Sequence, residues 1–158
     1  MARRAQKRNP APARWVETFK GAVLASEYDA AAYMNSQMYG SRFDQATWFL
    51  LQAVGLTPHR IKQQRLRVAI VRQNYQFLAE LCGGELITIK SGFFAVGGKY
   101  IRFIHQMFNG VTGRMVATSD CTAVLASLKT GRSIALPAAL QRKAKAHLVT
   151  SQNKKAIR

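Results

Sequence analysis

The segment from residue 27 to residue 39 holds the residue types best suited to chemistry in this chain. Asp29 is one of only seven acidic residues, and it stands just before the predicted start of a long helix. A helix start offers unpaired N–H groups and a partial positive charge, which can polarise a carbonyl. A carboxylate one turn upstream can attack that carbonyl or activate water. The arrangement suits acyl transfer, although an aspartate before a helix often serves only as a cap or a turn residue.

The helix that must position this segment is predicted from residue 35 to residue 54. Its apolar residues recur three and four positions apart, which is typical of one buried face. These residues are Tyr39, Phe43, Ala46, Leu50 and Val54. Asn35 or Ser36 can cap its first amides, and Gly55 followed by Pro58 ends it. At about 1.5 Å per residue, the helix would be about 30 Å long.

Strand patterns precede and follow this helix. They cover residues 16–25, 66–78, 86–96, 100–108 and 114–128. Glycine-containing links join the last four, and the link through Gly83 and Gly84 is expected to be a tight turn like the others. Pro137 is expected to open a short helix that runs to about Leu148. Consecutive strands with short links predict an antiparallel sheet, and the long helix must lie against it, so the sequence predicts a two-layer α+β fold.

Composition excludes several classes of protein. The 158 residues carry 24 Lys and Arg against 7 Asp and Glu, a net charge of +17, and 48% are hydrophobic, which favours a globular domain. No apolar run approaches the roughly 18 residues of a membrane span, and no apolar region follows the basic N-terminus as in a secretory signal. Cys82, Cys121 and three scattered histidines lack metal-ligand spacing. Two isolated thiols favour a reducing, cytoplasmic setting.

The positive charge is concentrated at the two ends of the chain. Residues 1–20 and 142–158 together hold half of the 24 cations. We expect a basic flexible tail over residues 1–14, one domain over 15–140, and a basic helix end and tail over 141–158. Such ends serve either solubility or attraction to a polyanion. An interior cluster lies closer to the folded body and is the better candidate for a specific phosphate contact. Its members are Arg60, Lys62, Arg65, Arg67 and Arg72.

Residues 29–39 resemble the D-x-x-G-H-x-N-x-x-x-Y signature of hot-dog-fold acyl-CoA thioesterases of the 4-hydroxybenzoyl-CoA thioesterase type. The resemblance continues through Phe43-Asp-Gln-Ala-Thr47, the strand pattern from Tyr75 to Leu86, and His105-Gln-Met107. It covers roughly residues 16–140, and the betainyl-CoA thioesterase-like proteins are the most similar subgroup. The resemblance implies a curved antiparallel sheet of about five strands wrapped around one long central helix, with a short C-terminal helix.

The resemblance also implies roles for individual residues. Asp29 takes the place of the catalytic carboxylate, the backbone N–H of Ser36 that of the oxyanion donor, and Asn35 that of the signature asparagine near the thioester. Residues implied to bind the substrate are Tyr33, Tyr39, Glu80 and His105. Residues implied to bind the CoA phosphates are Arg60, Lys62, Arg65, Arg67 and Lys99. No metal or organic cofactor is implied, and CoA enters only as part of the substrate. The family forms edge-to-edge homodimers, some paired into tetramers, with CoA at the subunit interface.

Two departures from the signature leave an alternative open. Ala32 replaces its glycine and Tyr33 its histidine, and alanine reaches a positive φ only with strain. We expect a thioesterase that acts on a small or medium acyl-CoA. The alternative is a non-catalytic hot-dog module that binds acyl-CoA or a protein partner. The net charge raises nucleic acid as a partner, but apart from Lys99 and Arg102 the cations do not interleave with aromatic residues as an RNA-binding sheet requires, which argues against it.

Overall fold

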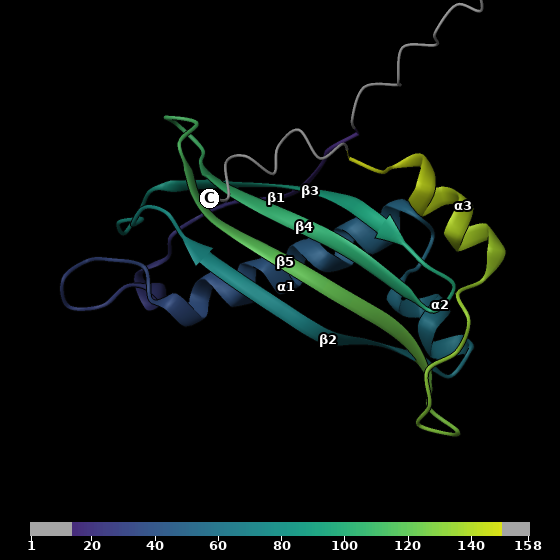
Figure 1. Ribbon diagram of the computed structural model, residues 1–158. Helices are drawn as coiled ribbons and strands as arrows, with labels where there is room; N and C mark the ends of the chain where they lie inside the picture. The colour runs from purple at the N-terminus through teal and green to yellow at the C-terminus, as the bar shows by residue number, and fades with distance from the viewer. Residues whose placement is uncertain (1–13, 150–158) are drawn as a thin grey trace, which may run out of the picture.

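The computed structural model describes residues 14–149. Its helices are α1 (Ser36–Ala53), α2 (Pro58–Gln63) and α3 (Ala138–Ala146), and a short 3-10 helix, η1 (Ala25–Glu27), precedes α1. Its strands are β1 (Val16–Ala22), β2 (Leu66–Phe77), β3 (Leu86–Val96), β4 (Tyr100–Asn109) and β5 (Met115–Ser127). The strands form one antiparallel sheet, and α1 lies across one face of it (Figure 1). The predicted two-layer α+β architecture is therefore confirmed.

The long helix forms where its sequence pattern predicts it. Asn35 is the N-cap, and its side-chain oxygen accepts a hydrogen bond from the amide of Gln37 at 3.0 Å. The predicted apolar positions are all buried against the sheet. Gly55 follows the helix with φ +83°, a conformation that suits a residue without Cβ. Pro58 does more than mark the end of α1, because it opens the unpredicted helix α2, whose N-cap Thr57 accepts from the Arg60 amide.

The order of the strands corrects one sequence expectation. The sheet runs β1-β3-β4-β5-β2, so β2 and β3 are not neighbours and the link through Gly83 and Gly84 is not a hairpin. The residues between these strands bond instead to the segment before α1. Met34 N–H donates to the Leu81 carbonyl at 2.8 Å, and Gly83 N–H donates to the Ala32 carbonyl at 2.9 Å. A glycine pair that resembles a hairpin turn therefore belongs to a crossing segment that packs beside the start of α1.

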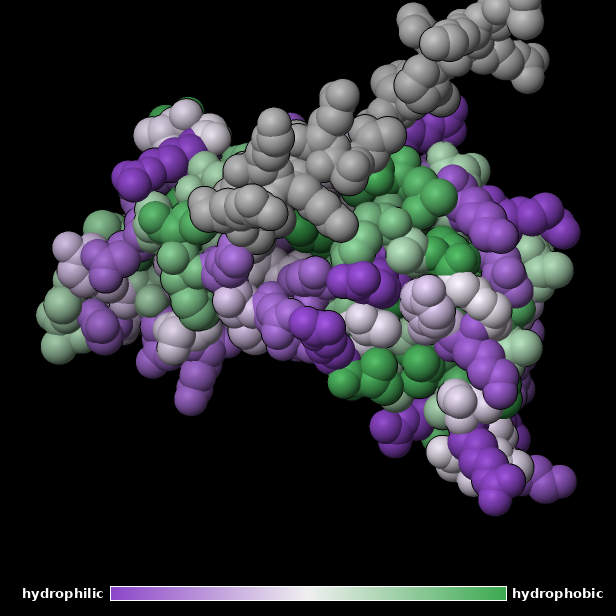
Figure 2. Space-filling model, viewed as in Figure 1, coloured by the Kyte–Doolittle hydropathy of each residue, from purple (hydrophilic) through white to green (hydrophobic). Residues whose placement is uncertain are grey.

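The C-terminal helix extends the packed part of the chain beyond residue 140. Ala144 on α3 is fully buried, and Val149 donates its amide to the Phe93 carbonyl at 2.7 Å. In Figure 2, hydrophilic side chains cover much of the end of the molecule where α3 and the loop after β5 lie. Residues 1–13 and 150–158, on which the predicted tails largely fall, lie outside the described residues. Among the helices described, none is long and apolar enough to span a membrane.

A row of polar side chains divides the core into two apolar clusters. One cluster surrounds Leu50 and Phe103, and the other surrounds Phe43 and Met107. Ser91, His105 and Ser119 occupy paired positions on β3, β4 and β5, and all three are fully buried. Buried polar groups need hydrogen-bond partners, so this row fixes how α1 and the strands fit together.

His105 lies at the centre of this polar row, and both of its ring nitrogens are bonded. Nε2 lies 2.9 Å from the hydroxyl of Thr47 on α1, and Nδ1 lies 2.5 Å from that of Ser91. Thr47 donates its single hydroxyl hydrogen to the Phe43 carbonyl, so it must accept from Nε2–H. Complete burial disfavours a charged ring, so the neutral form with its proton on Nε2 is assigned, and Nδ1 then accepts from Ser91. Burial lowers its pKa from 6.5 to about 3.

This lowered pKa predicts a loss of stability in mild acid. Between pH 6.5 and 3 the unfolded chain binds a proton at residue 105 that the folded chain does not. As the pH is lowered through this range, the free energy of unfolding should therefore decrease, by about 1.4 kcal/mol per pH unit from this group. Urea unfolding at pH 7.5, 6.0 and 5.0 should show a steeper decline for the wild type than for His105→Gln. The control His59→Gln, at an exposed histidine, should show the same pH dependence of stability as the wild type. Equal pH slopes for all three proteins would contradict the lowered pKa of His105.

Candidate active site

The segment between β1 and α1 is anchored by a buried ion pair. Glu27 lies 2.6 Å from the guanidinium of Arg42 on α1, and both side chains are about nine-tenths buried. The Glu27 carboxylate also accepts from the Leu24 amide, and its carbonyl accepts from the Asn35 amide at 2.7 Å. Because Glu27 bonds both to α1 and to its N-cap Asn35, the short loop between Glu27 and Asn35 is held in a fixed place.

Asp29 lies in that loop, and one of its two carboxylate oxygens is hydrogen-bonded to the backbone. Its Oδ1 accepts from the amides of Ala31 and Tyr33, at 2.9 and 3.2 Å, and its own amide donates to the Tyr33 carbonyl. Oδ2 has no partner among the described residues, and the side chain is exposed. The carboxylate is thus oriented by the backbone and keeps one oxygen available for chemistry.

Ala32 adopts the backbone conformation that its position demands. Its φ is +66°, in the left-handed region where glycine is favoured, and glycine is the residue that the family signature has here. The alanine costs about 1 kcal/mol relative to glycine, since its Cβ crowds the backbone. The turn nevertheless forms, with the Ala32 amide donating to the Asp29 carbonyl at 2.9 Å. Replacing glycine has therefore cost stability without removing the loop conformation that holds Asp29.

The first turn of α1 presents a free amide. Ser36 is the first residue of the helix, and its N–H donates to no acceptor among residues 14–149, as expected where no preceding turn supplies a carbonyl. The adjacent Gln37 amide is occupied by the side chain of Asn35. The helix dipole adds positive potential at this point. Ser36 is thus placed to donate a hydrogen bond to an oxygen that gains negative charge.

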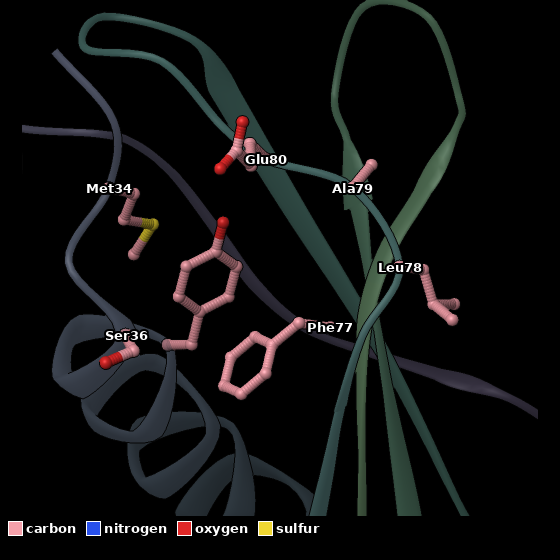
Figure 3. A pocket seen from close by; sticks show the side chains of 7 residues that line it. Met34, Ser36, Phe77, Leu78, Ala79 and Glu80 are labelled. Atoms are coloured by element: carbon pink, nitrogen blue, oxygen red, sulfur yellow. The ribbon is translucent and has the colours of Figure 1, made fainter. Parts of the chain in front are cut away.

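A pocket of about 410 Å³ opens beside this amide. Figure 3 shows Ser36 on the helix at one side of it and Phe77 and Glu80, from the end of β2 and the segment after it, at the other. Its full lining is Met34, Ser36, Tyr39, Phe77, Leu78, Ala79 and Glu80. An apolar wall with a few polar groups is typical of a small-molecule site.

Tyr39 contributes a hydroxyl group to this pocket. Its oxygen accepts from the Leu81 amide at 3.2 Å, so the hydroxyl hydrogen remains available to a ligand. Burial, more than the hydrogen bond that opposes it, raises the pKa of this phenol above its ordinary value of 10. Tyr39 therefore stays protonated at neutral pH and can act as a hydrogen-bond donor.

The predicted site residues fall into three groups. Ser36, Tyr39 and Glu80 line the pocket. Three others do not line it in the single chain but belong to the loop and cap next to it: Asp29, Tyr33 and Asn35. His105 does not reach the pocket, because it is fully buried in the core with both nitrogens bonded.

The cations predicted to bind the CoA phosphates lie at the opposite end of α1. Arg60 and Lys62 are on α2, which follows the C-terminal end of that helix. The 18 residues of α1 span about 27 Å, so no single chain brings these cations to the pocket. Arg65, Arg67 and Lys99 belong to the same end of the molecule, at the starts of β2 and β4 (Figure 1).

Sequence reasoning missed part of the pocket wall. Met34 lies just before the helix, Phe77 is the last residue of β2, and Leu78 and Ala79 follow it; none of these was predicted to contact the substrate. The missing signal was topological, since the wall depends on β2 lying at a sheet edge rather than beside β3. Among the described residues, no group of three or more His, Cys, Asp or Glu is placed to hold a metal ion.

Comparison with solved structures identifies the fold. A Staphylococcus aureus protein solved in complex with CoA has a TM-score of 0.80 at 16% identity, over 88% of this chain and 87% of its own. A 1,4-dihydroxy-2-naphthoyl-CoA thioesterase from Synechocystis has a TM-score of 0.73 at 14% identity, over 82% and 95%. A probable thioesterase from Escherichia coli gives 0.70 at 20% identity, over 85% and 100%. At these identities the likeness establishes the fold, and the predicted hot-dog fold is confirmed.

The sequence itself carries the family assignment. A search of curated proteins finds no match. The sequence model of the thioesterase-like superfamily, in contrast, matches residues 23–144, which include the Asp29 loop, all of α1 and the whole pocket wall. Since that match spans most of the 158 residues, the chain belongs to the thioesterase-like superfamily.

Proposed function

We propose that this protein hydrolyses the thioester of a small or medium acyl-CoA. The observation that carries the proposal is that Ser36, whose amide is free, lines a largely apolar pocket beside the loop that orients Asp29. Acyl hydrolysis needs a donor for the developing oxyanion and a group that supplies or activates the nucleophile. These two groups stand at one end of α1, and the superfamily assignment supports their use on a thioester.

The reaction follows from these positions. The thioester carbonyl oxygen would accept from the Ser36 N–H, which strengthens its bond as negative charge develops. The free oxygen of Asp29 would attack the carbonyl carbon, or take a proton from a water that does so. On the water route the carbon–sulfur bond then breaks, the proton taken up by Asp29 passes to the departing sulfur of CoA, and the carboxylic acid is released. On the direct route the thiolate leaves first, water hydrolyses the mixed anhydride formed on Asp29, and a proton from that water goes to the thiolate. Met34, Tyr39 and Phe77 would enclose the acyl group, and the Tyr39 hydroxyl and Glu80 carboxylate supply its polar contacts.

Asp29→Asn tests the carboxylate. The amide cannot act as base or nucleophile, so we expect thiol release from acyl-CoA esters to fall by a factor of about 10² to 10⁴ with the fold intact. Asp44→Asn is the matched control, because Asp44 is an exposed acid farther along α1. Equal rates for Asp29→Asn and the wild type would exclude the assigned role. Wild-type protein that is thermally stabilised by acyl-CoA esters without releasing thiol would instead favour the non-catalytic module.

Ser36→Pro tests the oxyanion donor directly. Proline removes the N–H yet is well tolerated in the first turn of a helix, and Asn35 already has the extended conformation that proline requires before it, with φ −63° and ψ 137°. We expect kcat to fall by a factor of about 10² to 10³, with little change in the unfolding temperature. Ser36→Ala, which keeps the N–H, should retain near wild-type kcat. If the two variants have the same kcat, the amide is not the donor.

We further propose that a second copy of the chain completes the site by pairing along β2. This strand lies at one edge of the sheet, spans 12 residues and is exposed along most of its length. Its apolar side chains include Val71, 60% exposed, and Phe77, 54% exposed. Long apolar edge strands are templates for pairing with another chain.

This pairing would bring the distant cations to the pocket. In an antiparallel pair with its two-fold axis at the middle of β2, the start of one strand faces the end of the other. Arg65 and Arg67 of the second copy would then approach Phe77, which lines the pocket. Arg60, Lys62 and Lys99 belong to the same end of that copy. The proposed binding of CoA phosphates by these cations therefore requires the dimer.

The double variant Ile70→Glu/Val71→Glu tests the dimer. Four new charges, two from each copy, would meet at the centre of the paired strands, so light scattering should give the mass of a monomer and thiol release should fall at least tenfold. Val111→Glu/Leu128→Glu is the matched control, because these apolar residues are comparably exposed in loops. The pairing is refuted if the β2 variant keeps the mass of the wild type while the protein remains folded.

A further inference from the structure

We propose that the end of the molecule opposite the pocket binds nucleic acid through its phosphate backbone. We call this surface the basic end. It is formed by α2, by Arg65 between α2 and β2, by the loop after β5, and by α3 (Figure 1). Its cations are Arg60, Lys62, Arg65, Lys129, Arg132, Arg142, Lys143 and Lys145, and all of them are exposed.

Backbone and side-chain contacts join these segments into one surface. The Leu128 amide donates to the Arg65 carbonyl at 2.9 Å, which ties the loop after β5 to the start of β2. Arg60 donates to the Gly55 carbonyl at 3.3 Å. A Cβ on Gly55 would lie 3.3 Å from the Lys143 ammonium and 3.7 Å from the Arg60 guanidinium, so α2 and α3 bring their cations to the same place. The cations thus follow a continuous strip from the loop through α2 to α3.

Within residues 14–149, no acidic side chain forms an ion pair with the cations of this strip. The last acidic residue in the sequence is Asp120, and none lies between Asp44 and Glu80. The ion pairs within residues 14–149 involve Lys20, Arg42 and Arg102, none of which belongs to the basic end. An elongated strip of unpaired, exposed cations attracts a ligand with many regularly spaced negative charges more strongly than a single small anion.

Nucleic acid fits the α3 part of this surface better than a membrane does. A helix that lies on a bilayer presents large apolar side chains beside its cations. The exposed residues of α3 other than its cations are Ala138, Ala139 and Ala146, and its one large apolar side chain, Leu140, is buried. The sequence argument against nucleic acid concerned aromatic residues for base stacking. Phosphate contacts do not need them and carry no sequence preference.

The α3 part of this surface can be tested apart from the proposed enzyme activity, whereas Arg60, Lys62 and Arg65 are shared with the proposed CoA site. The α3 cations Arg142, Lys143 and Lys145 are not among those proposed for CoA, and α3 contributes nothing to the lining of the pocket. The pocket lies at the other end of α1, so a polyanion on α3 does not cover it in the single chain. The function of this surface can therefore be tested by variants that leave thiol release unchanged.

The test measures salt-dependent binding of the full chain to a fluorescent 20-nucleotide RNA. The variant is R142Q/K143Q/K145Q, and the control K20Q/K90Q/R114Q removes the same charge from exposed positions on β1, β3 and the β4–β5 turn. For the α3 variant we expect at least a tenfold rise in Kd at 100 mM salt. The slope of log K against log salt should fall in magnitude by about 2, since each lost phosphate contact removes about 0.7. The control should change Kd less than threefold.

Other outcomes would overturn the proposal. Equal losses in the two variants would mean that net charge alone drives binding, and no loss in either would assign binding to other parts of the chain. Binding of the wild type to vesicles of phosphatidylglycerol and phosphatidylcholine, lost in the α3 variant, together with no RNA binding at 100 mM salt, would assign the surface to a membrane. Circular dichroism spectra that match the wild type establish that both variants are folded.

Discussion

One helix must bury an apolar face along its whole length, and the sheet has to be long enough to cover it. This constraint explains the long strands β2 to β5 and the two apolar clusters that lie along α1. It also determines where chemistry can occur. Along the helix the backbone groups are paired with one another, so the free Ser36 amide of the first turn is where its dipole can meet a ligand.

Burial alone would let the helix slide along the sheet, because apolar contacts have little directional preference. The bond between Thr47 and His105 opposes such sliding, since any displacement leaves a buried nitrogen or hydroxyl unpaired. The same bond explains why a histidine can tolerate complete burial. At the start of α1, the Glu27–Arg42 pair holds the Asp29 loop to the helix, so polar contacts help to fix the position of Ser36 relative to the loop.

The sequence was most informative where a pattern is local. The apolar stripe, the Asn35 cap and the glycine turns that flank β4 are features of a few neighbouring residues, and each element lies within a few residues of its predicted place. Strand order depends on distant pairings, so the Gly83–Gly84 link was misread. His105 was assigned to the substrate by resemblance alone, and its burial depends on partners from α1 and β3 that no local pattern reveals. For the same reason the wall formed by Phe77 to Ala79 was missed.

The acidic and basic residues are also separated along the molecule. Glu27, Asp29, Glu80 and Glu85 gather near the first turn of α1, while the basic end surrounds its last turn. Within residues 14–149 of a single chain, this separation amounts to an electric dipole with its axis roughly along the helix. In the field of any strongly anionic body it would rotate before contact, presenting the carboxylate-rich end, and with it the mouth of the pocket, toward bulk solvent.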